Sequence, residues 1–238
     1  MDTKLRKSQT LLHANRTSAR LFRPEVRVPG SILSFVPARG ASKTAWVAEE
    51  VSRILSEAMG IAVLYADFDA HGYRWRSSEA RRRPDGRVWG GLVTEVDGLG
   101  VLGARDVQPR QLGQLIESAR EYYAFVCADL SEAKEPHQLE VLRASDGIFL
   151  VSNSDRASLL AVREKSESMR LIGSSERCGL LLTRDPNGVS ASEAEDITGV
   201  PVCSLIDTPA QIEVFAGWLA SSARTGRQAP ALEYALAV

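Results

Sequence analysis

Two adjacent residues, Lys43 and Thr44, have the types and the sequence context of a phosphate-binding site. They follow an apolar stretch at residues 31–36 and a short turn of small residues, and they open a stretch of helical periodicity at residues 44–58. A helix N-terminus presents backbone N–H groups to an anion, and a lysine beside it neutralises the outer phosphates of a nucleotide. The Thr44 hydroxyl is placed to bind Mg²⁺. The pattern therefore predicts a loop that binds nucleotide phosphates.

The predicted loop departs from the usual phosphate-loop pattern, G-x-x-x-x-G-K-[ST]. That pattern has glycine where this chain has Pro37 and Ser42. Pro37 donates no N–H, and its ring fixes φ at about −65°. The residues expected to surround the phosphates are Arg39, Gly40, Ala41, Ser42, Lys43 and Thr44. The alternative interpretation is an ordinary strand–turn–helix unit with a solvated lysine.

Carboxylates end two further stretches that are typical of buried strands. Asp67 and Asp69 end the first stretch, and Asp129 ends the second. The carboxyl ends of parallel strands meet at one edge of a sheet, so we expect these side chains beside the phosphate loop. Asp129 would hold Mg²⁺ together with Thr44, and Asp67 or Asp69 would orient water for in-line phosphoryl transfer, with Lys43 as the charge on the phosphates. The alternative is that the aspartates only cap the turns that follow.

Strand-like and helix-like patterns alternate along the chain. The predicted strands are residues 31–36, 61–66, 99–102, 124–128, 147–152, 178–183 and 201–206. The predicted helices are residues 44–58, 109–121, 136–144, 156–171, 190–197 and 209–223. This alternation predicts an α/β protein built on a doubly wound, mostly parallel sheet with helices on both faces. We expect one domain at residues 29–224, with a basic arm at 1–28 and a tail at 225–238.

Five stretches in linear order resemble a known family. The chain reads VLYADFD, then GLGVLGARDVQPRQLGQLIESAREYYAFVCADL, ASDGIFLVSNSDRASL, CGLLLTRD and TGVPVCSLI. These stretches are similar to those of the MinD/ParA-type deviant P-loop ATPases, which include the cytoplasmic tyrosine-kinase domains of bacterial capsular polysaccharide assembly. The resemblance covers about residues 29–224, and within it the loop is a degenerate Walker A sequence.

The resemblance implies a function as well as a P-loop NTPase fold. It implies binding of ATP or ADP with Mg²⁺, with Thr183 and Arg184 on the adenine side, and slow hydrolysis. It also implies a dimeric switch or scaffold in a bacterial surface-polysaccharide (exopolysaccharide biosynthesis), pilus or partitioning machine. Two alternatives stay open. One is a non-hydrolysing scaffold that keeps only the fold, and the other is a tyrosine kinase, although the tail has only Tyr234 where such kinases carry a tyrosine cluster.

The expected homodimer differs from those of ParA-type relatives at one position. These relatives carry a signature lysine five residues before the loop lysine, where this chain has Ala38. Capsular kinases also lack that lysine. Alanine cannot reach phosphates across a dimer interface, so we expect dimer contacts that depend less on ATP. Arg39 and the arginine-rich segment Arg74–Arg87 would supply part of the missing charge.

The composition of the chain limits the classes of binding partner and the cellular compartment that we expect. The 238-residue chain is 44% hydrophobic and has a formal net charge of −1, so the chain as a whole is not an electrostatic nucleic-acid binder. A protein partner could bind Arg74–Arg87 or the basic arm, and the alternative is that both are solvated segments. No apolar run reaches the roughly 18 residues of a membrane span. We expect a cytoplasmic protein, peripheral at the inner membrane only through a partner, with three buried, reduced cysteines.

Overall fold

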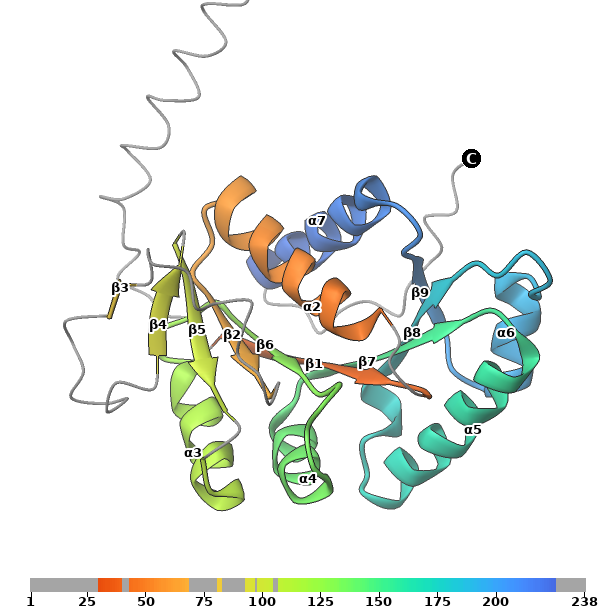
Figure 1. The fold of residues 1–238 in the computed structure, drawn as a ribbon, viewed down its shortest axis with the longest axis horizontal. Helices are drawn as coiled ribbons and strands as arrows, with labels where there is room; N and C mark the ends of the chain where they lie inside the picture. Colours follow the sequence, from red (N-terminus) through yellow and green to blue (C-terminus); the bar gives the residue numbers. More distant parts are fainter. Residues whose placement is uncertain are drawn as a thin grey trace, which may run out of the picture.

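A mixed sheet forms the centre of the protein in the computed structural model (Figure 1). The structure describes residues 30–39, 43–68, 81–82, 93–96, 98–104 and 107–225. The basic arm at 1–28, the tail after residue 225 with Tyr234, and all of Arg74–Arg87 except the backbone of Arg81–Arg82 lie outside these residues. The predictions made for those segments therefore remain predictions.

Nine strands form the sheet within the described residues, in the order β3-β4-β5-β2-β6-β1-β7-β8-β9. They are β1 (Ser31–Pro37), β2 (Val63–Asp67), β3 (Arg81–Arg82), β4 (Val93–Val96), β5 (Leu99–Gly103), β6 (Phe125–Asp129), β7 (Gly147–Asn153), β8 (Cys178–Thr183) and β9 (Val202–Leu205). All neighbours from β5 to β9 pair in parallel, whereas β3–β4 and β4–β5 are antiparallel. The prediction of a doubly wound, mostly parallel sheet is confirmed.

The two antiparallel strands at one edge, β3 and β4, were not predicted from the sequence. Strand β4 ends at Val96 and β5 begins at Leu99, and Gly98 between them has φ of +84°. In the sequence, the two residues between these strands are Asp-Gly. Asp-Gly between two strand-like stretches is a strong hairpin signal, because both residues tolerate the positive φ that such tight turns require. The sequence therefore carried a signal for β4 that the apolar-run pattern alone did not use.

Helices cover both faces of the sheet, as predicted (Figure 1). They are α2 (Thr44–Arg53), α3 (Pro109–Ala119), α4 (Glu135–Ala144), α5 (Arg156–Leu171), α6 (Ala191–Thr198) and α7 (Pro209–Thr225). Helices α2 and α7 pack on one face, where Val47 and Phe215 join its apolar core. Helices α3, α4, α5 and α6 pack on the other face. Each face of the sheet is thus buried, which explains the nearly continuous apolar strands.

The helix predicted at residues 44–58 changes its winding part-way along. It is α-helical to Arg53 and continues as a π-helical segment over Ile54–Ala58. Three consecutive residues at this point, Ile54, Leu55 and Ser56, are all buried. A regular α-helix would spread three consecutive side chains over about 200°. The wider π turn lets all three face the protein interior, and the Ser56 hydroxyl donates to the carbonyl of Gly98 at 3.0 Å.

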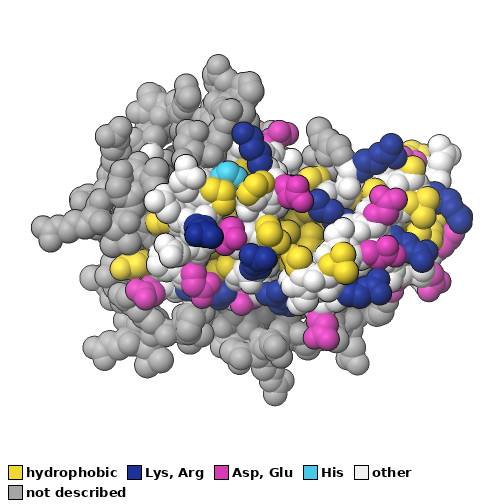
Figure 2. All heavy atoms as spheres, turned by 90° about the horizontal axis from the view of Figure 1, so that it is seen from below, with side chains coloured by type: hydrophobic (Ala, Val, Ile, Leu, Met, Phe, Trp, Pro, Cys, Tyr) yellow, Lys and Arg dark blue, Asp and Glu magenta, His cyan; other side chains and the backbone are white. Residues whose placement is uncertain are grey.

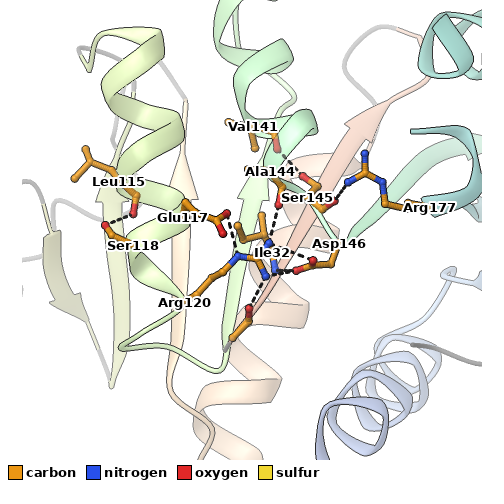
Figure 3. A network of polar contacts seen from close by, with 11 residues as sticks. Ile32, Leu115, Glu117, Ser118, Arg120, Val141, Ala144, Ser145, Asp146 and Arg177 are labelled. Atoms are coloured by element: carbon orange, nitrogen blue, oxygen red, sulfur yellow. Dashed lines mark hydrogen bonds and ion pairs between the residues drawn. The ribbon is translucent and has the colours of Figure 1, made fainter. Parts of the chain in front are cut away.

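A network centred on Arg120 fastens the amino edge of the sheet, where β1 begins (Figure 3). The guanidinium donates to the carbonyls of Gly30 and Ala144, at 2.8 and 2.9 Å, and bonds Asp146 through both Nη atoms. Asp146 also accepts from the backbone N–H of Ile32 at 2.8 Å. One charged pair therefore ties the start of β1 to the turn between α4 and β7.

Candidate functional site

Three central strands end together at the carboxyl edge of the sheet. Strand β6 lies between β1 and β2, and the parallel register aligns Asp129 with Phe35 on one side and with Asp67 on the other. Side chains alternate between the two faces along a strand. Tyr65 and Cys127 belong to the core beneath α2 and α7, so Asp67 and Asp129, each two residues further on, lie on that same face. The structure therefore brings two predicted site carboxylates side by side.

Helix α2 begins above these carboxylates, at the predicted Lys-Thr pair. Lys43 is the N-cap residue, and its carbonyl accepts the helix hydrogen bond from the N–H of Val47 at 2.9 Å. Thr44 is fully buried, whereas Lys43 is exposed and its ammonium lies 5.8 Å from the centre of the Trp46 ring. This distance is within the range of a cation–π contact. The N–H groups of the first helical turn open toward the carboxyl edge.

A buried tyrosine links the two carboxylate strands. The Tyr65 hydroxyl donates to Oδ2 of Asp129 at 3.1 Å, and the N–H of Ser131 donates to Oδ1 at 2.9 Å. Burial raises the pKa of Tyr65 well above its usual value, and the nearby charges of Asp129, Asp67 and Glu49 raise it further. Asp67 and Asp129 are both buried, so this edge concentrates carboxylate and hydroxyl oxygens with little access to solvent.

The oxygen ligands at this edge fit the chemistry of a nucleotide-bound Mg²⁺. Magnesium prefers oxygen, and in nucleotide sites it takes one or two carboxylates or hydroxyls plus phosphate oxygens and water. Asp67 and Asp129 lie on the face of the sheet that α2 covers, and the hydroxyl of buried Thr44 belongs to the first residue of that helix. Within the described residues, no group of three or more His, Cys, Asp or Glu side chains could hold a metal by itself. The arrangement fits a metal that arrives with its phosphates better than a resident metal cage.

The start of the predicted loop departs from the strand without losing a sheet hydrogen bond. The N–H of Ala38 donates to the carbonyl of Val151 in β7 at 3.0 Å. Backbone donors alternate between neighbours along a strand, so the N–H that Pro37 lacks would point toward β6. The paired register with β6 already ends at Phe35. Proline is therefore tolerated at the end of a central strand here, and Ala38 packs its methyl group against the core on the side of α3 to α6.

The two residues predicted on the adenine side lie at the carboxyl end of β8. Thr183 is buried, and its hydroxyl donates to the carbonyl of Ser152 at 3.2 Å. Arg184 is exposed; its N–H donates to Asp207 Oδ1 at 2.6 Å, and its Nε lies 3.6 Å from Asp207 Oδ2. These residues share the carboxyl edge with Asp67 and Asp129, because β8 runs parallel to β7 and β1.

Several predicted site residues fall outside the described part of the chain. They are Gly40, Ala41, Ser42 and Asp69. Arg39 is described and exposed at the end of β1. The assignment of residues 39–42 to a phosphate-binding loop, and of Asp69 to the attacking water, therefore stays a prediction.

Sequence reasoning missed Tyr65 and Trp46, the two aromatic neighbours of the site. Tyr65 stands two residues before Asp67, so the strand period of two already placed it on the face of the carboxylates. Trp46 stands three residues after Lys43, a spacing that brings side chains together on a helix. Both signals were present in the sequence, but neither matched a catalytic motif.

A concave region lies away from this edge, between α5 and α6. This cavity of about 550 Å³ is lined by charges of both signs, among them Arg163, Glu167, Arg170 and Asp196. It lies by Ser175 and Pro201, which precede β8 and β9, so it opens at the amino edge, opposite the carboxylates. Figure 2 shows the face covered by α3 to α6, where basic and acidic side chains are interspersed with apolar patches.

The cysteines follow the prediction in part. Cys127, Cys178 and Cys203 are free, and the first two are buried. Cys203 is only half-buried, so the prediction that all three are buried is wrong for this residue. It lies on β9, the strand at one edge of the sheet, where only one neighbouring strand covers it.

None of the described helices combines the length and the apolar character required to cross a bilayer.

Comparison with known proteins identifies the fold. No protein-family model matches the sequence, and no curated protein matches it significantly. The structure is similar to a ParA family ATPase from Chlorobium tepidum TLS, with a TM-score of 0.64, 17% identity, and coverage of 84% of this chain and 91% of that one. It is also similar to the septum site-determining protein MinD from Pyrococcus horikoshii OT3 complexed with Mg-ADP, with a TM-score of 0.60, 20% identity, and coverage of 79% and 86%.

A third similar structure also contains a nucleotide with magnesium. Cobyrinic acid a,c-diamide synthase from Mycobacterium smegmatis with bound ADP and magnesium matches with a TM-score of 0.60 and 15% identity, over 86% of this chain and 100% of that one. At these identities the comparisons establish the fold alone. The chain has the fold of the ParA/MinD-type ATPases, a branch of the P-loop NTPases.

Proposed function

We propose that this protein binds ADP or ATP with Mg²⁺ at the carboxyl edge of its sheet. The observation that carries the proposal is the alignment of Asp67 and Asp129 on the face of the sheet that α2 covers, with buried Thr44 as the first residue of that helix. Bound Mg²⁺ would neutralise phosphate charge and orient the phosphates. Lys43 would leave the Trp46 ring and bind the outer phosphates, which a flexible four-carbon side chain permits. The MinD structure complexed with Mg-ADP supports this choice of ligand.

Hydrolysis is proposed to be slow. Asp67 or Asp69 would orient the attacking water, and Arg39 would add positive charge at the phosphates. The loop has Pro37 and Ser42 in place of two glycines, and proline donates no N–H. Without the conformational freedom of glycine at these positions, the loop fits the phosphates less closely and stabilises less of the charge that develops during transfer.

Titration calorimetry and thermal unfolding of the full-length chain with MgADP and MgATP test the binding proposal. Ligand at 100 times its dissociation constant should stabilise the protein by about 2.7 kcal/mol. Lys43→Ala should abolish the stabilisation. Lys134→Ala is the matched control, because Lys134 is also an exposed lysine at the N-cap of a helix on the carboxyl edge, α4. The absence of heat and of a melting shift with either nucleotide would exclude the proposed function.

Asp129→Asn separates the metal from the nucleotide. The substitution keeps the size of the side chain and one acceptor oxygen but removes the charge that Mg²⁺ prefers. We expect binding in the presence of Mg²⁺ to fall to the level seen with EDTA, while binding without Mg²⁺ stays unchanged. Equal loss under both conditions would assign Asp129 to the fold.

A scaffold that keeps the fold without turnover is the second candidate, and the position of Ala38 favours it. Its methyl group packs against the core, so it cannot supply the cross-dimer charge of a lysine. We propose a homodimer that serves as a switch or scaffold in a surface-polysaccharide, pilus or partitioning machine. Sedimentation with and without MgATP, followed by phosphate release, separates the candidates. A chain that is monomeric alone and dimerises sharply on ATP would contradict a dimer whose contacts depend less on ATP.

A further inference from the structure

The carboxylate of Asp129 is held by donors from two directions. Tyr65, on the neighbouring strand β2, donates to Oδ2 at 3.1 Å, and the N–H of Ser131 donates to Oδ1 at 2.9 Å. An ionised carboxylate has about four acceptor sites on its two oxygens. The two hydrogen bonds thus hold one oxygen each, so together they define the orientation of the carboxylate.

The tyrosine is placed where it fixes the direction of the carboxylate. Tyr65 is 2% exposed, and its register partner in β6 is Cys127, two residues before Asp129 on the same face. Its hydroxyl thus approaches Asp129 from within the core, along the sheet surface beneath α2. Asp67 lies directly beside Asp129, and two neighbouring carboxylates repel each other. A donor from the core opposes rotation of Asp129 away from that neighbour.

We propose that Tyr65 is a positioning residue that aims the Asp129 carboxylate at the divalent cation of a bound Mg-nucleotide. The inference rests on the proposed nucleotide function and adds a residue that acts through Asp129. Hydrogen-bond partners of metal ligands hold the ligand in its binding orientation, and their loss commonly weakens metal affinity by about 10- to 100-fold. A purely structural tyrosine would affect stability and leave the response to Mg²⁺ unchanged.

Tyr65→Phe in the full-length chain tests the inference, because it removes only the hydroxyl oxygen. ADP affinity is measured by calorimetry across a Mg²⁺ titration and again in EDTA. We expect the Mg²⁺ concentration for half-maximal enhancement of ADP binding to rise about tenfold, with ADP affinity in EDTA unchanged. Tyr123→Phe is the matched control. It removes the same atom from another buried tyrosine, which belongs to the core on the opposite face.

The outcomes separate this inference from the proposed function. If the unmodified protein binds neither ADP nor ATP, the proposed function and the inference fail together; if it binds only ATP, the same titration is carried out with ATP. Binding by the unmodified protein with no change of the Mg²⁺ requirement in Tyr65→Phe overturns only the inference. A lower requirement also overturns it, because the hydroxyl would then compete with the cation. If Tyr65→Phe does not fold, Tyr65→Met carries the same expectation, since flexible methionine refills irregular core space.

Discussion

The amino and carboxyl edges of the sheet differ in how their charged side chains are arranged. At the amino edge, Arg120 meets Asp146 and backbone carbonyls, so opposite charges satisfy each other within the fold (Figure 3). At the carboxyl edge, Asp67 and Asp129 lie side by side on adjacent strands. Neighbouring like charges cost stability and are common where a protein binds a cation or a charged ligand. The contrast agrees with an amino edge that maintains the fold and with the nucleotide site that we propose at the carboxyl edge.

The largest effect is expected from Gly30→Ala at the amino edge. A Cβ atom at this position would lie 1.9 Å from the Tyr123 carbonyl oxygen, and backbone cannot move aside as a flexible side chain can. Such overpacking should destabilise the protein by about 3 kcal/mol in denaturant unfolding. Gly103→Ala, at the carboxyl end of β5, meets no atom within 4 Å and is the control. Similar losses in both variants would remove the contrast between the edges.

Arg120→Met should destabilise the protein by about 2 to 3 kcal/mol, because it removes charge-assisted hydrogen bonds but keeps the aliphatic stem. Arg143→Met is the control, since Arg143 forms a single exposed ion pair with Glu140 at 3.4 Å and should cost less than about 0.5 kcal/mol. Chemical unfolding measures both. A change of ADP affinity in Arg120→Met would contradict the division of roles, because this edge is assigned to the fold.

The free energy of unfolding at alkaline pH tests whether water is excluded from the core around Cys127, next to Asp67 and Asp129. Burial raises the pKa of the Cys127 thiol to about 12. In the unfolded chain the pKa of this thiol is about 8.5. The contribution of the buried, protonated thiol to stability is therefore complete below that pH and is lost as the pH rises toward 12. We expect this thiol to account for about 2 kcal/mol of lost stability between pH 7 and pH 10. Between pH 7 and pH 10, Cys127→Ala should lose less stability than the unmodified protein by this amount. If the stability of both proteins falls equally with pH, water reaches the thiol in the folded state.

The smallest effect is expected from Asp155→Ala. Asp155 is a carboxylate at the carboxyl edge of the sheet, and its role is local and structural. Asp155 is the N-cap of α5 and accepts from the N–H of Ser158 at 2.9 Å. Its loss should cost about 1 kcal/mol. The hydrogen bonds from Ser158 lower the pKa of Asp155, so its contribution is present above pH 4 or so and lost as the pH falls further. ADP affinity should stay unchanged, in contrast to Asp129→Asn, and a change would extend the site to α5.

The sequence predicted the features that depend on local pattern. Continuous apolar runs such as residues 178–183 located β8 to the residue, because a parallel strand covered on both faces must be apolar throughout. The neighbourhood of Asp67 and Asp129 followed from the rule that parallel strands end at one edge. Strand β3 could not be predicted in this way, since it has two residues and depends on pairing with β4.

The contacts that depend on register were beyond local pattern. Tyr65 reaches Asp129 because β2 and β6 pair in one register out of several that their apolar residues would permit. Arg120 contacts Asp146 and the carbonyl of Gly30, which lie 26 and 90 positions away in the chain. Such long-range polar contacts leave no periodic signal in a single sequence. They are fixed only when the strands have taken their order.

The central place of β1 in the sheet means that the strands it pairs with are synthesised long after it. Its first residue, Ser31, pairs with Phe125 in β6, and its other neighbour, β7, begins only at Gly147. Ribosomes add roughly 5 to 20 residues per second. At that rate the apolar strand waits about 5 to 20 s after its own synthesis before its first partner exists. During that interval, Ile32, Phe35 and Val36 are an exposed target for chaperones and for aggregation.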